Sequence, residues 1–301
     1  MNAWEFEKNN LEKIMSYSKE YMSFLDNGKT ERTSCKEIVK MAKEKGYISL
    51  CEAMKKGSIK KGDKIYAINK EKAVALFLIG EKEIQEGMKI IGGHIDVPRV
   101  DLKPNPLYEE SNLGFLKTHY YGGIKKYQWT TIALAIHGVV ILNDGTKVDI
   151  CIGEDETDPV FCITDLLPHL AKDQMTKTMS EGVIGEKLNV LVGNMPLFGE
   201  EKDKVEKNIL KILNEKYNMT NEDFLSAEIE VVPAGKSRDV GFDRSMILSY
   251  GHDDRVCSYA GVKALLDTEN TLYTSVALCV DKEEVGSNGN TGMHSKFFEN
   301  T

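Results

Sequence analysis

The chain has 301 residues, of which 41% are hydrophobic and 29% charged, and the excess of Asp and Glu over Lys and Arg gives a net charge of −8. This composition excludes a disordered or fibrous chain, because it supplies enough apolar side chains for a buried core. The acidic balance argues against nucleic acid or an anionic membrane as the main partner.

The first ~55 residues predict helices. The first helix has an apolar stripe at three-, four- and seven-residue spacing, formed by Leu11, Ile14, Met15, Met22 and Leu25. A second helix is expected to begin near the capping residue Ser34.

Signals for export or membrane insertion are weak in this sequence. The charged segment 1–15 does not have the pattern of a signal peptide, and no apolar run approaches the ~20 residues that cross a bilayer. The six cysteines include no CxxC pair, which is typical of reduced thiols. We therefore expect a cytoplasmic protein with no membrane partner.

The hydrophobic period then changes from helix to strand. Lys64–Ile68 and Ala73–Ile79 predict a hairpin, and Lys89–Gly92 predicts a third strand that the pair Ile90–Ile91 would bury on both faces. Near the end of the chain, a helix is expected over Asp253–Leu266 and a central strand over Ser275–Val280.

Residues 98–241 differ in texture from both flanks. Short β-like runs alternate with Gly and Asp turns and with two helical pieces, in the order Phe115–Tyr121, Ile132–Leu142, Val148–Ile152, the helical Asp158–Lys172 and Lys202–Tyr217, and Ala227–Val232. We therefore expect an α/β domain made of residues 1–97 and 242–301, interrupted by an inserted β-rich domain of residues 98–241.

Three motifs carry residue types suited to a metal site. His94 and Asp96 follow the third predicted strand, where an imidazole could bind a metal while the carboxylate fixes its tautomer. Asp253 opens a predicted helix, and Glu283 and Glu284 follow the predicted central strand, where one could ligate a metal and the other accept a proton. Taken singly, each motif has a structural alternative: a hydrogen-bonded histidine, a helix cap and a solvated charge run.

Together and in this order, the three motifs resemble those of the co-catalytic two-zinc aminopeptidases. The segments 92–109, 119–129 and 166–171 narrow this resemblance to the aspartyl-aminopeptidase family, over nearly the whole chain. The resemblance implies a mixed-sheet, three-layer zinc-peptidase domain interrupted by a dimerisation domain. It also implies a homo-oligomer built on dimers, and peptide substrates with a free N-terminus and a preference for acidic first residues.

The resemblance also implies a role for each residue of the motifs. His94 corresponds to a ligand of one divalent metal ion and Glu284 to a ligand of the other, with Asp253 bridging two zinc ions. Asp96 corresponds to the residue that orients His94, and Glu283 to the general base.

A further histidine, His169, resembles one that reaches a neighbouring subunit's active site, although a structural role within a helical segment remains open. In the family, a later Asp and a later His complete the two metal sites. Here the only candidate ligands after Glu284 are His294 and Glu299, which are wrongly placed in family terms. We therefore expect a catalytic domain that is incomplete at its C-terminus and inactive alone. A non-catalytic homologue that keeps the fold and assembly role, and a related metal-dependent deacylase, are the alternatives.

Overall fold

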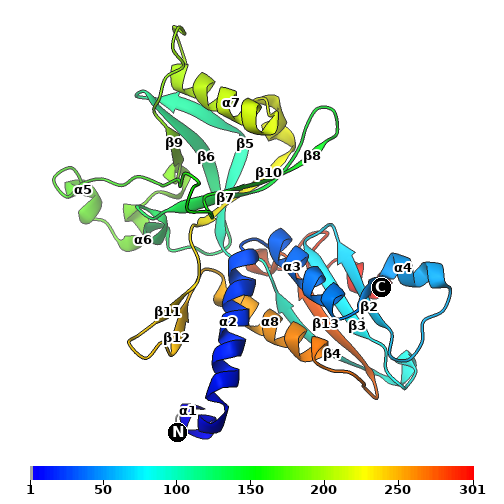
Figure 1. Ribbon diagram of the computed structural model, residues 1–301. Coiled ribbons are helices and arrows are strands. Elements are labelled where there is room, and N and C mark those ends of the chain that lie inside the picture. Colours follow the sequence, from blue (N-terminus) through cyan, green and yellow to red (C-terminus); the bar gives the residue numbers. More distant parts are fainter. Residues whose placement is uncertain (1–2) are drawn as a thin grey trace. The chain divides into compact units, whose positions relative to one another are not determined.

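The structure, a computed structural model, describes residues 3–301 (Figure 1). The chain forms two compact units, the first made of Met1–Val97 and Lys236–Thr301 and the second of Pro98–Gly235. The second unit ends at Gly235, whereas the sequence analysis placed this boundary at residue 241. The segment after Gly235 belongs to the first unit, since the backbone N–H of Ser237 donates to Asp26 Oδ1 at 2.6 Å.

A mixed five-stranded sheet is the frame of the first unit. Its strand order is β1-β2-β3-β13-β4, with β13 antiparallel to β3 and parallel to β4. The strands are β1 (Ile48–Ser49), β2 (Lys64–Asn69), β3 (Ala73–Leu78), β4 (Met88–His94) and β13 (Thr274–Val280). The expected mixed-sheet α/β class and the central position of the last strand are therefore confirmed.

The expectation that Ile90 and Ile91 bury both faces of β4 is wrong. These side chains are 48% and 49% exposed, because β4 pairs only with β13 in the described sheet. An edge strand lacks a second neighbour to cover its side chains, and its apolar composition alone does not reveal this.

Three helices cover one face of this sheet: α2 (Leu11–Asn27), α3 (Glu31–Glu44) and α8 (His252–Leu266). Leu76 lies between Tyr66 and Ala277 in the strand register, and all three belong to the core cluster with Phe24 and Ile38. The sheet face and the helix stripes therefore form one continuous apolar core.

The second helix begins earlier than the sequence analysis placed it. Thr30 caps α3 in a reciprocal arrangement with Thr33, whereas Ser34 lies buried inside the helix and donates to Gly28 O. The remaining elements of this unit are α1 (Ala3–Phe6), α4 (Leu50–Lys56), α9 (Phe297–Asn300), the hairpin β11 (Arg238–Val240) and β12 (Met246–Leu248), and the 3-10 turns η1 (Lys8–Asn10), η2 (Ile84–Glu86) and η6 (Glu283–Val285).

The second unit is built on a six-stranded antiparallel sheet. Its order is β8-β7-β10-β5-β6-β9, formed by β5 (Arg99–Glu110), β6 (Leu113–Tyr121), β7 (Leu134–Ile141), β8 (Lys147–Ile152), β9 (Val190–Gly193) and β10 (Ala227–Pro233). The helix α7 (Lys204–Tyr217) lies over β5, β6 and β9 (Figure 1). Shorter helical turns are η3 (Lys126–Trp129), α5 (Lys172–Met175), α6 (Met179–Gly182), η4 (Gly185–Lys187) and η5 (Glu222–Ser226).

The helix expected over Asp158–Lys172 is absent from the described structure. Residues 161–163 instead form isolated β-bridges, and the chain then turns. Pro159 and Pro168 explain this, because proline disfavours the helical conformation of the preceding residue. Within residues 3–301, no helix combines the length and apolarity needed to cross a bilayer.

Candidate metal centre

Two of the three sequence motifs meet at the carboxyl ends of two neighbouring strands in the first unit's sheet. His94, the last residue of β4, pairs with Val280, the last residue of β13, and the two strands are parallel. Both strands therefore end at the same end of the sheet. Glu283 and Glu284 follow in the short turn η6, next to the loop that carries Asp96.

The His94 ring is held in one orientation. Its Nδ1 lies 3.0 Å from the backbone oxygen of Asp96 and 3.3 Å from Asp96 Oδ1. Because a carbonyl oxygen can only accept a hydrogen bond, Nδ1 carries a proton. Nε2 consequently faces the other carboxylates, at 3.5 Å from Asp253 Oδ1 and 3.7 Å from Glu283 Oε2.

The charge around His94 decides its protonation. Burial alone lowers the pKa of His94, but the contacts with Asp96 and the charge of Glu283 outweigh it and raise the pKa to about 9. A cation at Nε2 would compete with this proton, so its affinity would rise with pH.

Asp96 ties the two motifs together. It is fully buried, and its Oδ1 and Oδ2 accept hydrogen bonds from the backbone N–H groups of Glu283 and Glu284, each at 3.2 Å. The same carboxylate lies beside His94 Nδ1. One side chain therefore positions both the histidine ring and the backbone of the glutamate pair.

The third motif reaches the same place from α8. Asp253 is the second residue of this helix and has an almost fully exposed side chain, and the Asp253–Asp254 peptide bond is cis. Glu284 is more buried than Glu283, and this burial raises the pKa of the Glu284 carboxyl. The side chains that converge on His94 thus differ in their access to solvent.

The donor set fits a zinc ion. Ligand atoms of His94, Glu283 and Glu284 all lie within 4.8 Å of one another. Two atoms bound to one tetrahedral zinc at about 2.1 Å lie about 3.4 Å apart, close to the 3.5 Å between His94 Nε2 and Asp253 Oδ1. That separation exceeds an ordinary hydrogen bond, so the two groups converge without bonding to each other.

Two residues of α8 that the sequence analysis did not select support this edge. Ser258 Oγ donates to the backbone oxygen of His94 at 2.9 Å. Arg255, fully buried, donates through Nε and Nη2 to the backbone oxygen of Ile95, both at 3.2 Å. The sequence could have indicated both residues, because Arg255 and Ser258 are three positions apart and lie on the helix face that also carries the apolar Val262.

His169 lies in the second unit, in an exposed turn rather than the helical segment expected from sequence. Its expected role concerns a neighbouring subunit and stays a prediction. His137, also in the second unit, instead has an internal partner, since its Nε2 lies 2.8 Å from Glu154 Oε1.

Comparison with known proteins gives one family for nearly the whole chain. Residues 24–301 match the model of the aminopeptidase I zinc metalloproteases (M18). A probable M18 family aminopeptidase 1 of Clostridium acetobutylicum is 53% identical over all of this chain and 65% of its own length. The chain thus spans about 65% of the length of the curated relatives it matches.

Solved structures agree with this fold. The crystal structure of an M18 family aminopeptidase from Thermotoga maritima superposes with a TM-score of 0.91 at 48% identity, over 95% of this chain and 62% of that chain. The crystal structure of aminopeptidase I from Clostridium acetobutylicum gives 0.90 at 49% identity, over 100% of this chain and 66% of that chain.

Proposed function

This chain belongs to the M18 family of aminopeptidase I zinc metalloproteases, and on that premise we propose that its sheet edge is the metal centre of an aminopeptidase that acts on peptides with a free N-terminus. The observation that carries the proposal is the convergence of His94 Nε2 with the carboxylates of Asp253, Glu283 and Glu284. These groups come from segments far apart in the sequence, and the buried Asp96 holds two of those segments together.

We assign the metal ligands from the contacts of each side chain. His94 would hold one zinc ion and the more buried Glu284 a second, with the exposed Asp253 bridging them. Zinc in such a site polarises a carbonyl and makes an attacking water more acidic. Asp96 acts by orienting His94, because it contacts Nδ1 and leaves Nε2 available.

Glu283 is assigned as the general base. Its side chain is about half exposed, so a substrate and a water molecule can approach it, and its Oε2 lies 3.7 Å from His94 Nε2. The carboxylate would accept the proton of the attacking water and return it to the leaving amine. A preference for acidic first residues is part of the proposal and rests on the family resemblance.

A complete two-zinc centre of this kind would need two further protein ligands, which this sequence does not carry at the positions that the family resemblance implies. Catalytic zinc normally has three protein ligands, and His94 and Glu284 with a shared Asp253 supply fewer for each ion. We therefore expect the 301-residue chain to bind zinc weakly and to hydrolyse no peptide on its own.

Zinc binding tests the site separately from catalysis. In a competition titration against a chromophoric chelator, His94→Ala and Glu284→Gln should each weaken zinc binding, while Glu283→Gln should weaken it least. His119→Ala is the matched control, because His119 lies exposed in the second unit. Equal zinc affinities for His94→Ala and His119→Ala would contradict the site and favour a non-catalytic homologue.

Hydrolysis assays separate the remaining alternatives. Release of aspartyl or leucyl anilide products by the purified chain with zinc would support the aminopeptidase and overturn the expected lack of ligands. Activity on N-acetylated amino acids, without activity on free-amine substrates, would favour a deacylase.

We also propose that the second unit mediates a homo-oligomer built on dimers. Large apolar side chains gather exposed on one of its segments, namely Leu166, Leu167, Leu170, Met175 and Met179, and such a patch is typical of a protein interface. His169 lies within it, which supports a role in a neighbouring copy's site. Leu167→Asp should lower the mass measured by analytical ultracentrifugation, and an unchanged mass would contradict this interface.

The cysteines support a cytoplasmic location as part of the same proposal. All six are free thiols, and Cys35 and Cys279 are buried as small apolar residues.

A further inference from the structure

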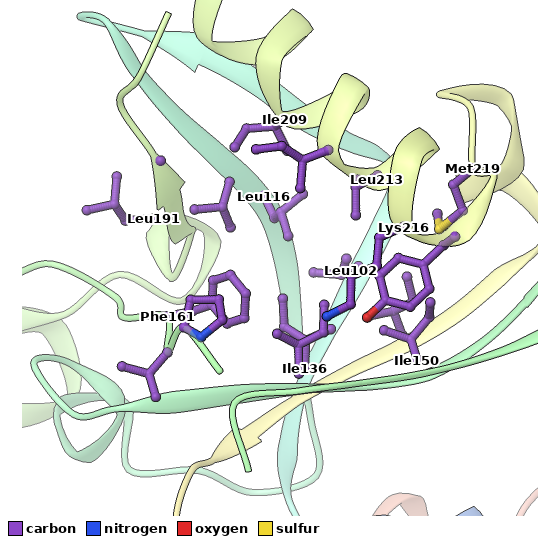
Figure 2. Close-up of a pocket in the computed structure, with 18 of the residues that line it drawn as sticks. Leu102, Leu116, Ile136, Ile150, Phe161, Leu191, Ile209, Leu213, Lys216 and Met219 are labelled. Atoms are coloured by element: carbon purple, nitrogen blue, oxygen red, sulfur yellow. The ribbon is translucent and has the colours of Figure 1, made fainter. Parts of the chain in front are cut away.

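The second unit contains a cavity of about 630 Å³ between α7 and one face of its sheet. Figure 2 shows Ile209 and Leu213 on the helix side and Leu116, Ile136 and Ile150 on the strand side, all pointing into the space. The lining is almost entirely aliphatic or aromatic. The cavity lies wholly within the second unit and shares no residue with the metal centre.

The packing of α7 explains where the space opens. Near the first turns of the helix, two glycines of the sheet allow close approach: a Cβ at Gly114 would lie 3.2 Å from Val205 Cγ1, and one at Gly193 would lie 2.9 Å from Ile209 Cδ1. Val205 is accordingly buried. Beyond Ile209, Leu213 and Lys216 of the helix line the cavity together with strand residues such as Ile150.

One cation lines this apolar space. Lys216, in the last turn of α7, has its Nζ 5.3 Å from the centre of the Tyr217 ring. Among residues 3–301 no carboxylate lies within 4 Å of this ammonium group. A side-chain hydrogen bond to Tyr217, and to a lesser extent the charge of Asp158, raise the pKa of Lys216 and keep it charged. Because an ammonium group has three donors, it can bind an anion at the cavity in addition to Tyr217.

This combination selects a class of ligand. A polar ligand would lose its hydrogen bonds to water without replacement, since the cavity offers few donors or acceptors. An apolar chain has no hydrogen bonds to water to lose by entering, and the volume is within the range of small-molecule sites. A single negative charge at one end of such a chain would meet Lys216.

We propose that this cavity binds a straight-chain monocarboxylate, the chemistry of a fatty acid. The tail lies between Leu213 and the strand residues Ile136 and Ile150, and the carboxylate pairs with Lys216. The site is distinct from the proposed metal centre and requires neither zinc nor catalysis.

Isothermal titration of the purified chain with hexanoate, octanoate, decanoate and dodecanoate, below their micelle concentrations, tests the tail. Each added methylene that enters the cavity should lower Kd about fourfold, until the cavity is full and Kd levels off. A Kd that does not depend on chain length would overturn the proposal.

The charge is tested with matched variants of α7. Lys216→Met keeps most of the apolar stem and should raise the Kd of dodecanoate about fivefold, as expected for a partly exposed ion pair. Lys211→Met, on the outer face of the same helix beside Glu215, should leave Kd unchanged. Equal effects of the two substitutions would refute the placement of the carboxylate.

Filling the cavity completes the test. Ile150→Phe should abolish binding while the melting temperature is kept, and Leu116→Phe serves the same purpose if Ile150→Phe does not fold. Unchanged binding of dodecanoate to the folded variant would overturn the site. If the chain binds no dodecanoate and the substitution instead changes its oligomeric state, the occupant is a second copy of the chain, and the proposal is also overturned. Cosedimentation with phosphatidylglycerol vesicles, and no binding of free dodecanoate, would assign the surface to membranes and overturn the proposal too.

Discussion

Arg255 is the largest fully buried side chain of the chain's described part, and its removal tests how the sheet edge is held. The guanidinium donates to the backbone oxygen of Ile95 at 3.2 Å and to that of Lys29 at 2.9 Å. It thereby joins α8 to the residue after His94 and to the loop between α2 and α3. We predict that Arg255→Leu lowers the local free energy of unfolding of the first unit by about 3 kcal/mol.

The magnitude follows from these contacts. Each of the two carbonyl groups loses a buried donor, and a buried polar group left unpaired costs about 1–3 kcal/mol, or about 4 kcal/mol for the pair at the middle of that range. The leucine fills part of the volume and removes a buried charge whose desolvation had opposed folding, which returns about 1 kcal/mol. The difference leaves a net loss of about 3 kcal/mol.

Hydrogen exchange measured at single amides is the suitable assay, because a chain with two units need not unfold in a single step. The amides of β13 should lose protection, while those of β7 in the second unit should not. Arg244→Leu is the control, since this arginine is 73% exposed and its guanidinium lies 3.5 Å from Asp239. A loss below about 1 kcal/mol in β13, or equal losses in both variants, would refute the reasoning.

Three further predictions concern charge, capping and packing. Burial lowers the pKa of His137, but Cys151 and Glu154 outweigh it and hold the pKa near 9, so the stability gained from the bound proton is complete below the unfolded value of about 6.5 and is lost as pH rises to about 9. An NMR titration of the imidazole should show that midpoint, and Glu154→Gln should lower it. Ser49→Ala removes the cap of α4, where Ser49 Oγ accepts from the N–H of Glu52, and should cost about 1 kcal/mol in the exchange of the helix amides. Ile38→Ala leaves a hole in the fully buried core of the first unit and should lower its unfolding free energy by about 3 kcal/mol in urea denaturation.

The sequence identifies the residues of the candidate site but not the distances between them. His94 and the pair Glu283–Glu284 are identifiable because each follows an apolar strand, and the ends of such strands collect functional groups. That β4 and β13 are parallel neighbours, with His94 opposite Val280, depends on pairing across a long stretch of chain. Local patterns carry no information about that pairing, so the distances to Asp253 could not be predicted.

The failures of sequence reasoning have the same origin. Apolar composition predicted a doubly covered strand at Ile90–Ile91, but coverage depends on neighbours that the pattern does not encode. The periodicity of 158–172 resembles a helix, yet Pro159 and Pro168 and the β-bridge between Cys162 and Leu191 determine an irregular path. Tertiary contacts override local preference in both places.

The division of work proposed for Glu283 and Glu284 depends on Asp96 more than on either glutamate. Consecutive residues in a 3-10 turn project about 120° apart, so two adjacent carboxylates can serve different purposes only if the turn is fixed in rotation. Asp96 fixes it, because one oxygen accepts from each glutamate's N–H, whereas an asparagine would place an NH2 donor against one of these N–H groups. The same carboxylate lies 3.3 Å from His94 Nδ1, beside the backbone oxygen of Asp96 that fixes the tautomer. A change in the position of Asp96 would therefore move the histidine and both glutamates together. The geometry of the proposed centre thus depends on a buried residue that need not touch a metal.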